Sequence, residues 1–420
     1  MALYDVPMVF VLIGLIAYTV LSGADFGAGL WQLTAGKGPK AAALQEHAHH
    51  AIAPVWEANH VWLVFVLTVL WTTYPVAFGS IASTLTIPLF IAAVGIICRG
   101  ATYALDAGAA NDRERRAIDA VFSASCALTP FAMGTAVGGI ASGRVPVGNA
   151  AGDLFTSWLN PTSVLVGILA VVLSAFLAAV YLGADAQRIE ESDLVHRFRW
   201  RALASGVVAG IAAVAGLPIL HADAPSLLDG LLRGGGLVAL IVSCVCGLAS
   251  LVLVWVHRFA PARYTAAVAA AAIIVGWAVA QYPVLLPGLT VEDAAAPDST
   301  LIAVTISVLA GAVLLLPSLA LLFRLDLRGR FDVTPQHPDR SSVQQPPARP
   351  ETPSGSWFSL STRVAIACLL LGVGLLNVAD AAWAHAVGVV ALFGFVVSGL
   401  AAVKPEVIAA ESDSGEVQHH

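Results

Sequence analysis

One short segment of the sequence places a carboxylate, an amide and an imidazole inside an apolar run. Glu57, Asn59 and His60 lie in APVWEANHVWL, between Trp56 and Trp62. Glu57 and His60 are three residues apart, so on a helix they share a face and could exchange a proton or bond to each other. An ionisable group inside a membrane span costs about 2.5–3.5 kcal/mol on insertion scales, which makes it a functional candidate. The alternative for Glu57 is a position at the membrane interface, beside a tryptophan belt.

A second carboxylate, Asp25, lies in the glycine-rich segment SGADFGAGL of the first apolar run. Glycines at this spacing let a neighbouring helix approach closely. Asp25 is therefore either an acid in a packing seam, which reaches the interface or pairs with a base, or a proton-carrying carboxylate that close packing shields from lipid. Arg99, in ICRGATY, either neutralises Asp25 or Glu57 or extends its side chain to the membrane surface.

We predict neither a metal site nor a covalently attached cofactor. His47, His49 and His50 match no standard zinc spacing, and we expect them to be solvated in a turn. His60 has no second intramembrane histidine near it in the sequence, so a packing role is favoured over haem or metal ligation. The five cysteines lie in apolar runs, as small buried hydrophobes do. A phosphate-binding glycine loop, a dinucleotide fingerprint and a Cys-x-x-Cys-His motif are absent from the sequence, and we expect no nucleic-acid partner.

The composition is that of an integral membrane protein. Hydrophobic residues make up 58% of the chain and charged residues 11%, whereas soluble domains average roughly 45–50% and 25%. Apolar runs long enough to cross a hydrocarbon layer of about 30 Å lie near 7–33, 53–77, 80–105, 116–141, 161–184, 200–220, 236–257, 262–282, 299–323, 363–379 and 382–403. The sequence therefore predicts an all-α polytopic protein.

Basic residues follow every odd-numbered predicted span, whereas the opposite turns carry only Arg144 and Arg233. By the positive-inside rule, the N-terminus lies outside the cell membrane and the C-terminus in the cytoplasm. The core is assigned to residues 1–325. Three segments are expected to follow the core: a disordered Pro/Ser-rich linker at 326–360, a transmembrane hairpin at 361–403 and a polar tail at 404–420.

Several segments together resemble subunit II of the cytochrome bd-type quinol oxidases. IAPVWEANHVWL is the most specific of them, and SGADFGAGL resembles the acidic first helix of that family. TTYPVAFGSIAS, CRGATY, TPFAMGTAVGGIASG, LFTSWLNPTSVLVG and YPVLLPGLTVEDAAAPDSTL follow in the family's order and spacing, over roughly residues 7–330. The resemblance implies a core of two four-helix bundles plus a peripheral helix.

The resemblance also implies a heterodimer in the membrane of a bacterial cell, working in the respiratory chain. Its subunit I holds the b-type and d-type haems and the quinol-oxidising loop, and reduces oxygen to water. This chain would bind no cofactor, contribute no catalytic residue, stabilise subunit I and help supply cytoplasmic protons. Lipid and quinone are further expected partners. The hairpin has no counterpart in the family, and we expect it to replace a small accessory subunit.

Asp25 and Glu57 match the two acids that the family links to proton supply. The expected proton path consists of Glu57, Asp25, His60, Asn59 and Ser22, supported by Trp56, Trp62 and Arg99. Two departures weaken a multi-carboxylate relay: Ser22 stands where many members have a further acid, and RGATYALD lacks the acid and second arginine that often follow Arg99. Two other classes stay open, a purely structural partner subunit and a cation-coupled secondary transporter, although the acids lie away from the midplane expected for the transporter.

Overall fold

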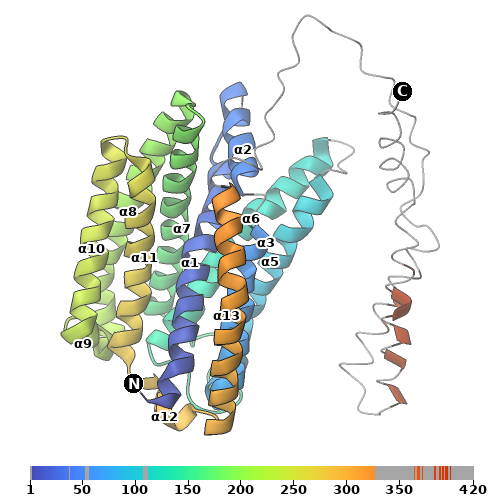
Figure 1. The fold of residues 1–420 in the computed structure, drawn as a ribbon, viewed down its shortest axis with the longest axis vertical. Helices are drawn as coiled ribbons and strands as arrows, with labels where there is room; N and C mark the ends of the chain where they lie inside the picture. Colours follow the sequence, from blue (N-terminus) through green and yellow to red (C-terminus); the bar gives the residue numbers. More distant parts are fainter. Residues whose placement is uncertain are drawn as a thin grey trace, which may run out of the picture. The chain divides into compact units, whose positions relative to one another are not determined.

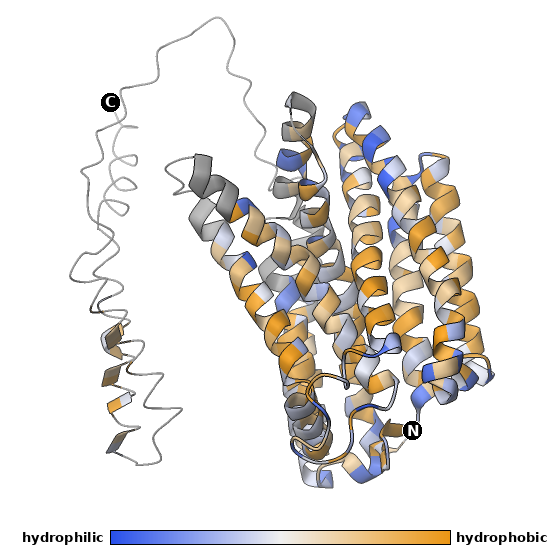
Figure 2. Ribbon diagram, turned by 180° about the vertical axis from the view of Figure 1, so that it is seen from behind, coloured by the Kyte–Doolittle hydropathy of each residue, from blue (hydrophilic) through white to orange (hydrophobic). Residues whose placement is uncertain are grey.

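The computed structural model describes residues 2–36, 38–52, 56–106 and 112–326, with separate residues between 364 and 398. The chain divides into two compact units, Met1–Arg328 and Gly329–His420. The predicted linker, hairpin and tail therefore fall almost entirely outside the described residues. In the first unit apolar residues cover the long helices and polar residues gather at their ends (Figure 2).

Long helices dominate the first unit, as the apolar runs predict (Figure 1). They are α1 (Val6–Leu33), α3 (Trp56–Thr73), α5 (Thr86–Asp106), α6 (Asp112–Ala141), α7 (Pro161–Arg188), α8 (Ser192–Asp223), α10 (Gly234–Trp255), α11 (Phe259–Gln281) and α13 (Asp298–Asp326). The shorter elements are η1 (Leu3–Asp5), α2 (Pro39–Ile52), α4 (Pro75–Thr84), α9 (Pro225–Leu231), α12 (Val291–Ala294) and the antiparallel strands β1 (Val284–Leu286) and β2 (Leu289–Thr290). The predicted all-α class is confirmed.

Within the described residues, six helices are long and apolar enough to cross a membrane, and a seventh span results when α4 and α5 are counted together. Shorter apolar stretches occur in α3, at Asn59–Thr73, and in α13, at Asp298–Val313. These helices occupy the positions of the predicted core spans. The chain is a multi-pass membrane protein, and the full number of spans and their orientation stay predictions.

The third predicted span, 80–105, is not one straight helix. It is divided at Leu85 between α4 and α5, which are bent by 82°. Proline explains where α4 and α5 begin, because its ring is tolerated in the first turn of a helix but disrupts the interior of a helix. Pro75 is the first residue of α4 and Pro88 the third residue of α5. The same rule ends α3 at Thr73, before the predicted end of the second span.

Helices α7, α8, α10 and α11 pack in a closed four-helix bundle, each against two of the others (Figure 1). Small apolar side chains such as Ala184, Ala202, Ala266 and Ala270 fill its interior and let the helices approach closely. Helix α1 packs against α3, α6 and α7, while α5 packs on α6 and α13 on α3. A second closed bundle and a peripheral ninth helix stay predictions.

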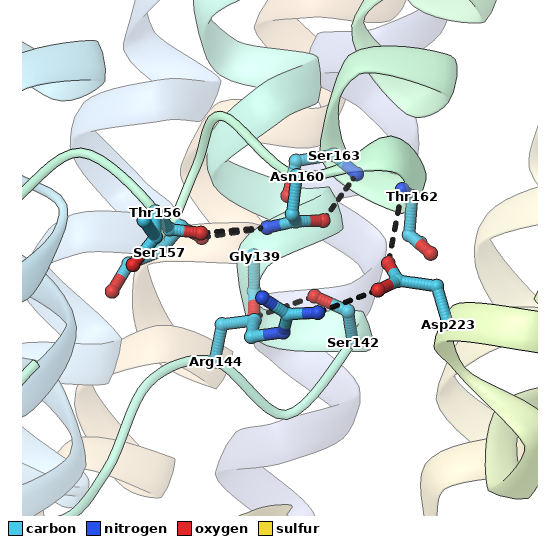
Figure 3. A network of polar contacts seen from close by, with 9 residues as sticks. All are labelled: Gly139, Ser142, Arg144, Thr156, Ser157, Asn160, Thr162, Ser163 and Asp223. Carbon is cyan, nitrogen blue, oxygen red and sulfur yellow. Dashed lines mark hydrogen bonds and ion pairs between the residues drawn. The ribbon is translucent and has the colours of Figure 1, made fainter. Parts of the chain in front are cut away.

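A polar network joins the turn after α6 to the start of α7 and the end of α8 (Figure 3). Arg144 pairs with Asp223 at 2.5 Å, and the other carboxylate oxygen of Asp223 accepts the backbone N–H of Thr162 at 3.1 Å. The side-chain oxygen of Asn160 accepts the N–H of Ser163 at 2.9 Å, as an N-cap does. These bonds satisfy N–H groups that the first turn of α7 would leave unpaired.

Candidate functional site

The base that pairs with Asp25 is Arg99, on α5. The Arg99 guanidinium forms an ion pair with the Asp25 carboxylate through Nη2 and Oδ1, and Nη2 also donates to the Asp25 carbonyl oxygen at 3.3 Å. Asp25 is 2% exposed and Arg99 is fully buried. Arg99 therefore does not extend to the surface, which was the alternative for this residue. Each charge needs the other, since a buried charge without a partner is strongly destabilising.

Helices α1 and α6 hold the Arg99 guanidinium between them. Its central carbon lies 4.9 Å from the ring centroid of Phe26 and 5.3 Å from that of Phe122, as in cation–π contacts. Nη1 contacts the sulfur of Cys126 at 3.7 Å. Of the five cysteines expected to be buried, Cys126 is buried, Cys244 is exposed and the others are partly buried. Cys126 is also a polar neighbour of the arginine, a role that the sequence did not predict. Contacts from both sides fix the position of the guanidinium.

Close packing of α1 keeps the Asp25 region away from lipid. A Cβ atom at Gly27 would overlap the carbonyl group of Ser174 on α7, and one at Gly29 would overlap the sulfur of Cys126 on α6. The glycines after Asp25 therefore permit two separate helix contacts. The first interpretation of SGADFGAGL, an acid in a packing seam that pairs with a base, is observed, and a proton-carrying role for Asp25 stays a prediction.

Part of the predicted path gathers around Asp25. The His60 ring on α3 lies with its centroid 6.1 Å from the Tyr18 ring and 6.1 Å from the Phe26 ring. Ser22 and Asn59 are buried, as is Asp25. Asp25 and His60 were expected here from the sequence, whereas the aromatic contacts of Tyr18 and Phe26 with the His60 ring were not.

Three buried oxygen atoms on α1 have no hydrogen-bond partner among the described residues: the Tyr18 hydroxyl, the Ser22 hydroxyl and Oδ2 of Asp25. Buried polar groups are normally bonded to protein or to ordered water. A buried water typically makes about three hydrogen bonds to such groups. The side chains around Asp25 thus offer a polar surface suited to water.

For several predicted residues the structure does not describe the side chain. The side chains of Trp56, Glu57, His49 and His50 lie outside the described residues, although α3 includes the backbone of Trp56 and Glu57. A contact between Glu57 and His60 stays a prediction. Trp62 packs edge-on against Phe65 of its own helix, with ring centroids 6.2 Å apart.

The sequence predicted that His47 is solvated in a turn, and this prediction is wrong. It lies on α2, is 9% exposed, and its Nε2 atom is 3.1 Å from the carbonyl oxygen of Leu182. Its ring centroid is 5.8 Å from that of Phe198. Leu44 and Ala48 of α2 are fully buried in the same contact. Their helical spacing, one apolar residue per turn, was the signal in the sequence that this segment packs as a helix.

The described residues contain no group of three or more His, Cys, Asp and Glu side chains that could hold a metal ion. Residues 3–326 match the family model described as cytochrome bd terminal oxidase subunit II. Among solved structures, the bd oxidase from Geobacillus thermodenitrificans has a chain similar to this one, at 25% identity and a TM-score of 0.60. That similarity covers 78% of this chain and 99% of the other. No curated protein sequence matches this chain.

Proposed function

Because this chain belongs to the cytochrome bd terminal oxidase subunit II family, we propose that it stabilises a haem-bearing subunit I and helps to supply that subunit with cytoplasmic protons. Subunit I carries haems b and d, oxidises quinol and reduces oxygen. The basic turns then face the cytoplasm and the N-terminus faces outward. The similarity to a bd oxidase structure supports membership of such a complex. The rest of the proposal depends on residues of this chain.

The observation that carries the proton role is the arrangement of the two Asp25 oxygens. Oδ1 is paired with Arg99, whereas Oδ2 is buried without a partner among the described residues. A purely structural ion pair is best stabilised when the remaining lone pairs are also satisfied. An oxygen left open beside the hydroxyls of Tyr18 and Ser22 is instead suited to binding water, and through it protons.

The chemistry of the complex explains why such groups are needed. Reduction of oxygen to water consumes protons, and an apolar interior admits them only along groups that bind and release them. In this proposal, Glu57 receives protons at the cytoplasmic start of α3, and His60 lies one turn further along that helix. Asp25, with its charge compensated by Arg99, holds the water that connects α3 to α1. Glu57 is the more important acid.

Glu57→Gln tests the proton role, because glutamine keeps the size of the side chain and removes its exchangeable proton. In the complete complex, oxygen consumption should fall about tenfold or more, since positioned proton-transfer groups typically contribute at least that much. Haem content and assembly should stay normal. Glu57→Asp should retain part of the activity, and Asp25→Asn should reduce turnover less than Glu57→Gln does.

Glu292→Gln is the matched control, since Glu292 lies on α12, in a turn assigned to the opposite side of the membrane. It should leave turnover unchanged. If Glu57→Gln consumes oxygen and takes up protons at the wild-type rate with normal haem content, the proton role is wrong. The chain would then be a purely structural partner of subunit I.

A further inference from the structure

At one end of the bundle of α7, α8, α10 and α11, two turns form an open cavity with both polar and apolar lining atoms. Its volume is about 360 Å³, and it is lined by Gln187, Glu190, Ser192, Val195, His196 and His257. The Gln187 amide nitrogen donates to the carbonyl oxygen of His257 at 2.8 Å, which joins the α7–α8 turn to the α10–α11 turn. None of these residues belongs to the Asp25 cluster.

Arg199 lies between two exposed tryptophans, one turn of α8 beyond the cavity. Its guanidinium carbon is 4.8 Å from the ring centroid of Trp255 and 5.7 Å from that of Trp200. The two indole rings meet edge to face at 6.2 Å, and the Trp200 ring lies 6.4 Å from that of His196, which lines the cavity. The cavity and the tryptophan pair therefore form one continuous surface.

Only some of the hydrogen-bond donors of the Arg199 side chain have a partner within the part of the protein that the structure describes. Nη2 donates to the carbonyl oxygen of Trp255 at 2.8 Å, near the end of α10. Nε is buried and has no partner among the described residues. A guanidinium presents several donors in a plane and can bind two oxygens of a phosphate group at once. Because Nε is buried, an anion at the surface would be bound by the terminal nitrogens of Arg199.

The surface on the other side of the tryptophans is apolar. Ile211 and Val214 of α8 are 63% and 67% exposed, and Leu248 and Val252 of α10 are 64% and 60% exposed. In a chain that spans a membrane, apolar side chains that no helix of the chain covers can pack against lipid acyl chains. Tryptophan is enriched where the hydrocarbon meets the head groups, because one edge of its ring is polar. Trp200 and Trp255 therefore mark the head-group level.

We propose that this surface binds one membrane phospholipid, with its phosphate on Arg199, its head group in the open cavity and its acyl chains along α8 and α10. Glu190 and Gln187 offer acceptor oxygens in the cavity, which favours a head group that donates hydrogen bonds, such as glycerol, over choline. The lipid holds the α7–α8 and α10–α11 turns together from outside. Arg199 thus caps a helix and recognises a phosphate.

Native mass spectrometry of the complete, delipidated complex tests the proposal, with dioleoylphosphatidylglycerol added as the probe. The wild type should retain one lipid that Arg199→Gln binds about tenfold or more weakly, because hydrogen bonds between charged groups are stronger than neutral ones. Dioleoylphosphatidylcholine should bind more weakly than phosphatidylglycerol. Arg199→Lys keeps the charge and a donor for the Trp255 carbonyl, so it should assemble even if glutamine does not, with intermediate lipid binding.

Arg258→Gln is the control, because Arg258 is exposed in the neighbouring turn and its replacement changes the net charge equally. It should bind lipid as the wild type does. Equal weakening by Arg258→Gln would mean that surface charge alone attracts lipid. Displacement of the bound lipid by millimolar inorganic phosphate would reduce the site to a general anion site. Either result, or full lipid retention by both Arg199 variants, overturns the proposal.

Discussion

The two groups of helices in the first unit differ in what they enclose. In the described residues, α1, α3, α5 and α6 surround the Asp25–Arg99 pair and the His60 ring. The bundle of α7, α8, α10 and α11 surrounds small apolar side chains such as Ala202 and Ala266. Its ion-paired and capping charges lie near the helix ends, as Asp223 and Arg199 do.

This difference separates an interior that contains charges from one that is apolar. Burying charges is costly even when they are paired, so a polar interior weakens the packing around it. Small apolar residues permit close helix contacts without that cost. Helix α1 packs on α7, so the first group is supported by the second. Variants that change only one of the two interiors should therefore have unequal effects.

Arg99→Leu should have the largest effect, because it leaves the Asp25 carboxylate buried without its partner. Loss of one member of a buried pair costs about 3–5 kcal/mol. Assembly of the complex, measured as haem-bearing protein recovered from membranes, should fall sharply. The double variant Asp25→Asn, Arg99→Leu should recover part of it, since no uncompensated charge is left. If the Arg99→Leu variant yields as much haem-bearing protein as the wild type, the first group of helices does not depend on its buried ion pair.

Gly27→Ala and Gly210→Ala compare a glycine at the contact between the two groups with an exposed glycine of the bundle. An added Cβ at Gly27 meets the backbone of Ser174, whereas at Gly210 of α8 nothing lies within 4 Å. Gly27→Ala should therefore cost about 1–3 kcal/mol. Gly210→Ala should be neutral or stabilising by up to about 1 kcal/mol, because alanine favours helix. Thermal denaturation of the purified complex measures both, and equal melting temperatures would contradict the difference.

Arg144→Gln tests whether charges at the helix ends matter less than the buried pair. Arg144 is 39% exposed, and a partly exposed ion pair contributes about 1 kcal/mol or less. Asn160 still caps α7 in this variant. We expect a small decrease in melting temperature and unchanged oxygen consumption. If Arg144→Gln destabilises the complex as much as Arg99→Leu does, the ion pair at the helix ends is as important for stability as the buried one.

Ser22→Ala should have the smallest effect on stability. The Ser22 hydroxyl is buried without a partner among the described residues, so its removal should change the free energy of unfolding by less than about 1 kcal/mol. If it binds water beside Asp25, oxygen consumption should decrease while the melting temperature does not. Unchanged turnover would remove Ser22 from the proposed path.

The sequence predicted the core helices well, because long apolar runs separated by charged turns have few alternatives in a membrane. It also offered Asp25 as one of two possible partners for Arg99, the other being Glu57. It could not choose between them, because the partners are 74 residues apart and only packing brings them together. The Cys126 contact, the burial of His47 and the position of Arg199 over Trp255 depend on packing in the same way. Pro88 indicated a new helix start near Leu85, but the uninterrupted apolar run across this position favoured one continuous span.

That break changes how the third span fits a bilayer. The 21 residues of α5 extend about 31 Å at 1.5 Å per residue, close to the thickness of the hydrocarbon layer. Helix α4 need not add length, and at 82° to α5 it is free to lie along the membrane surface. Its Ser80 and Ser83 hydroxyls accept the backbone N–H groups of Gly148 and Ala150 at 2.9 and 2.8 Å. A thinner bilayer that tilts α5 would therefore move this loop as well, making the loop a reporter of membrane thickness.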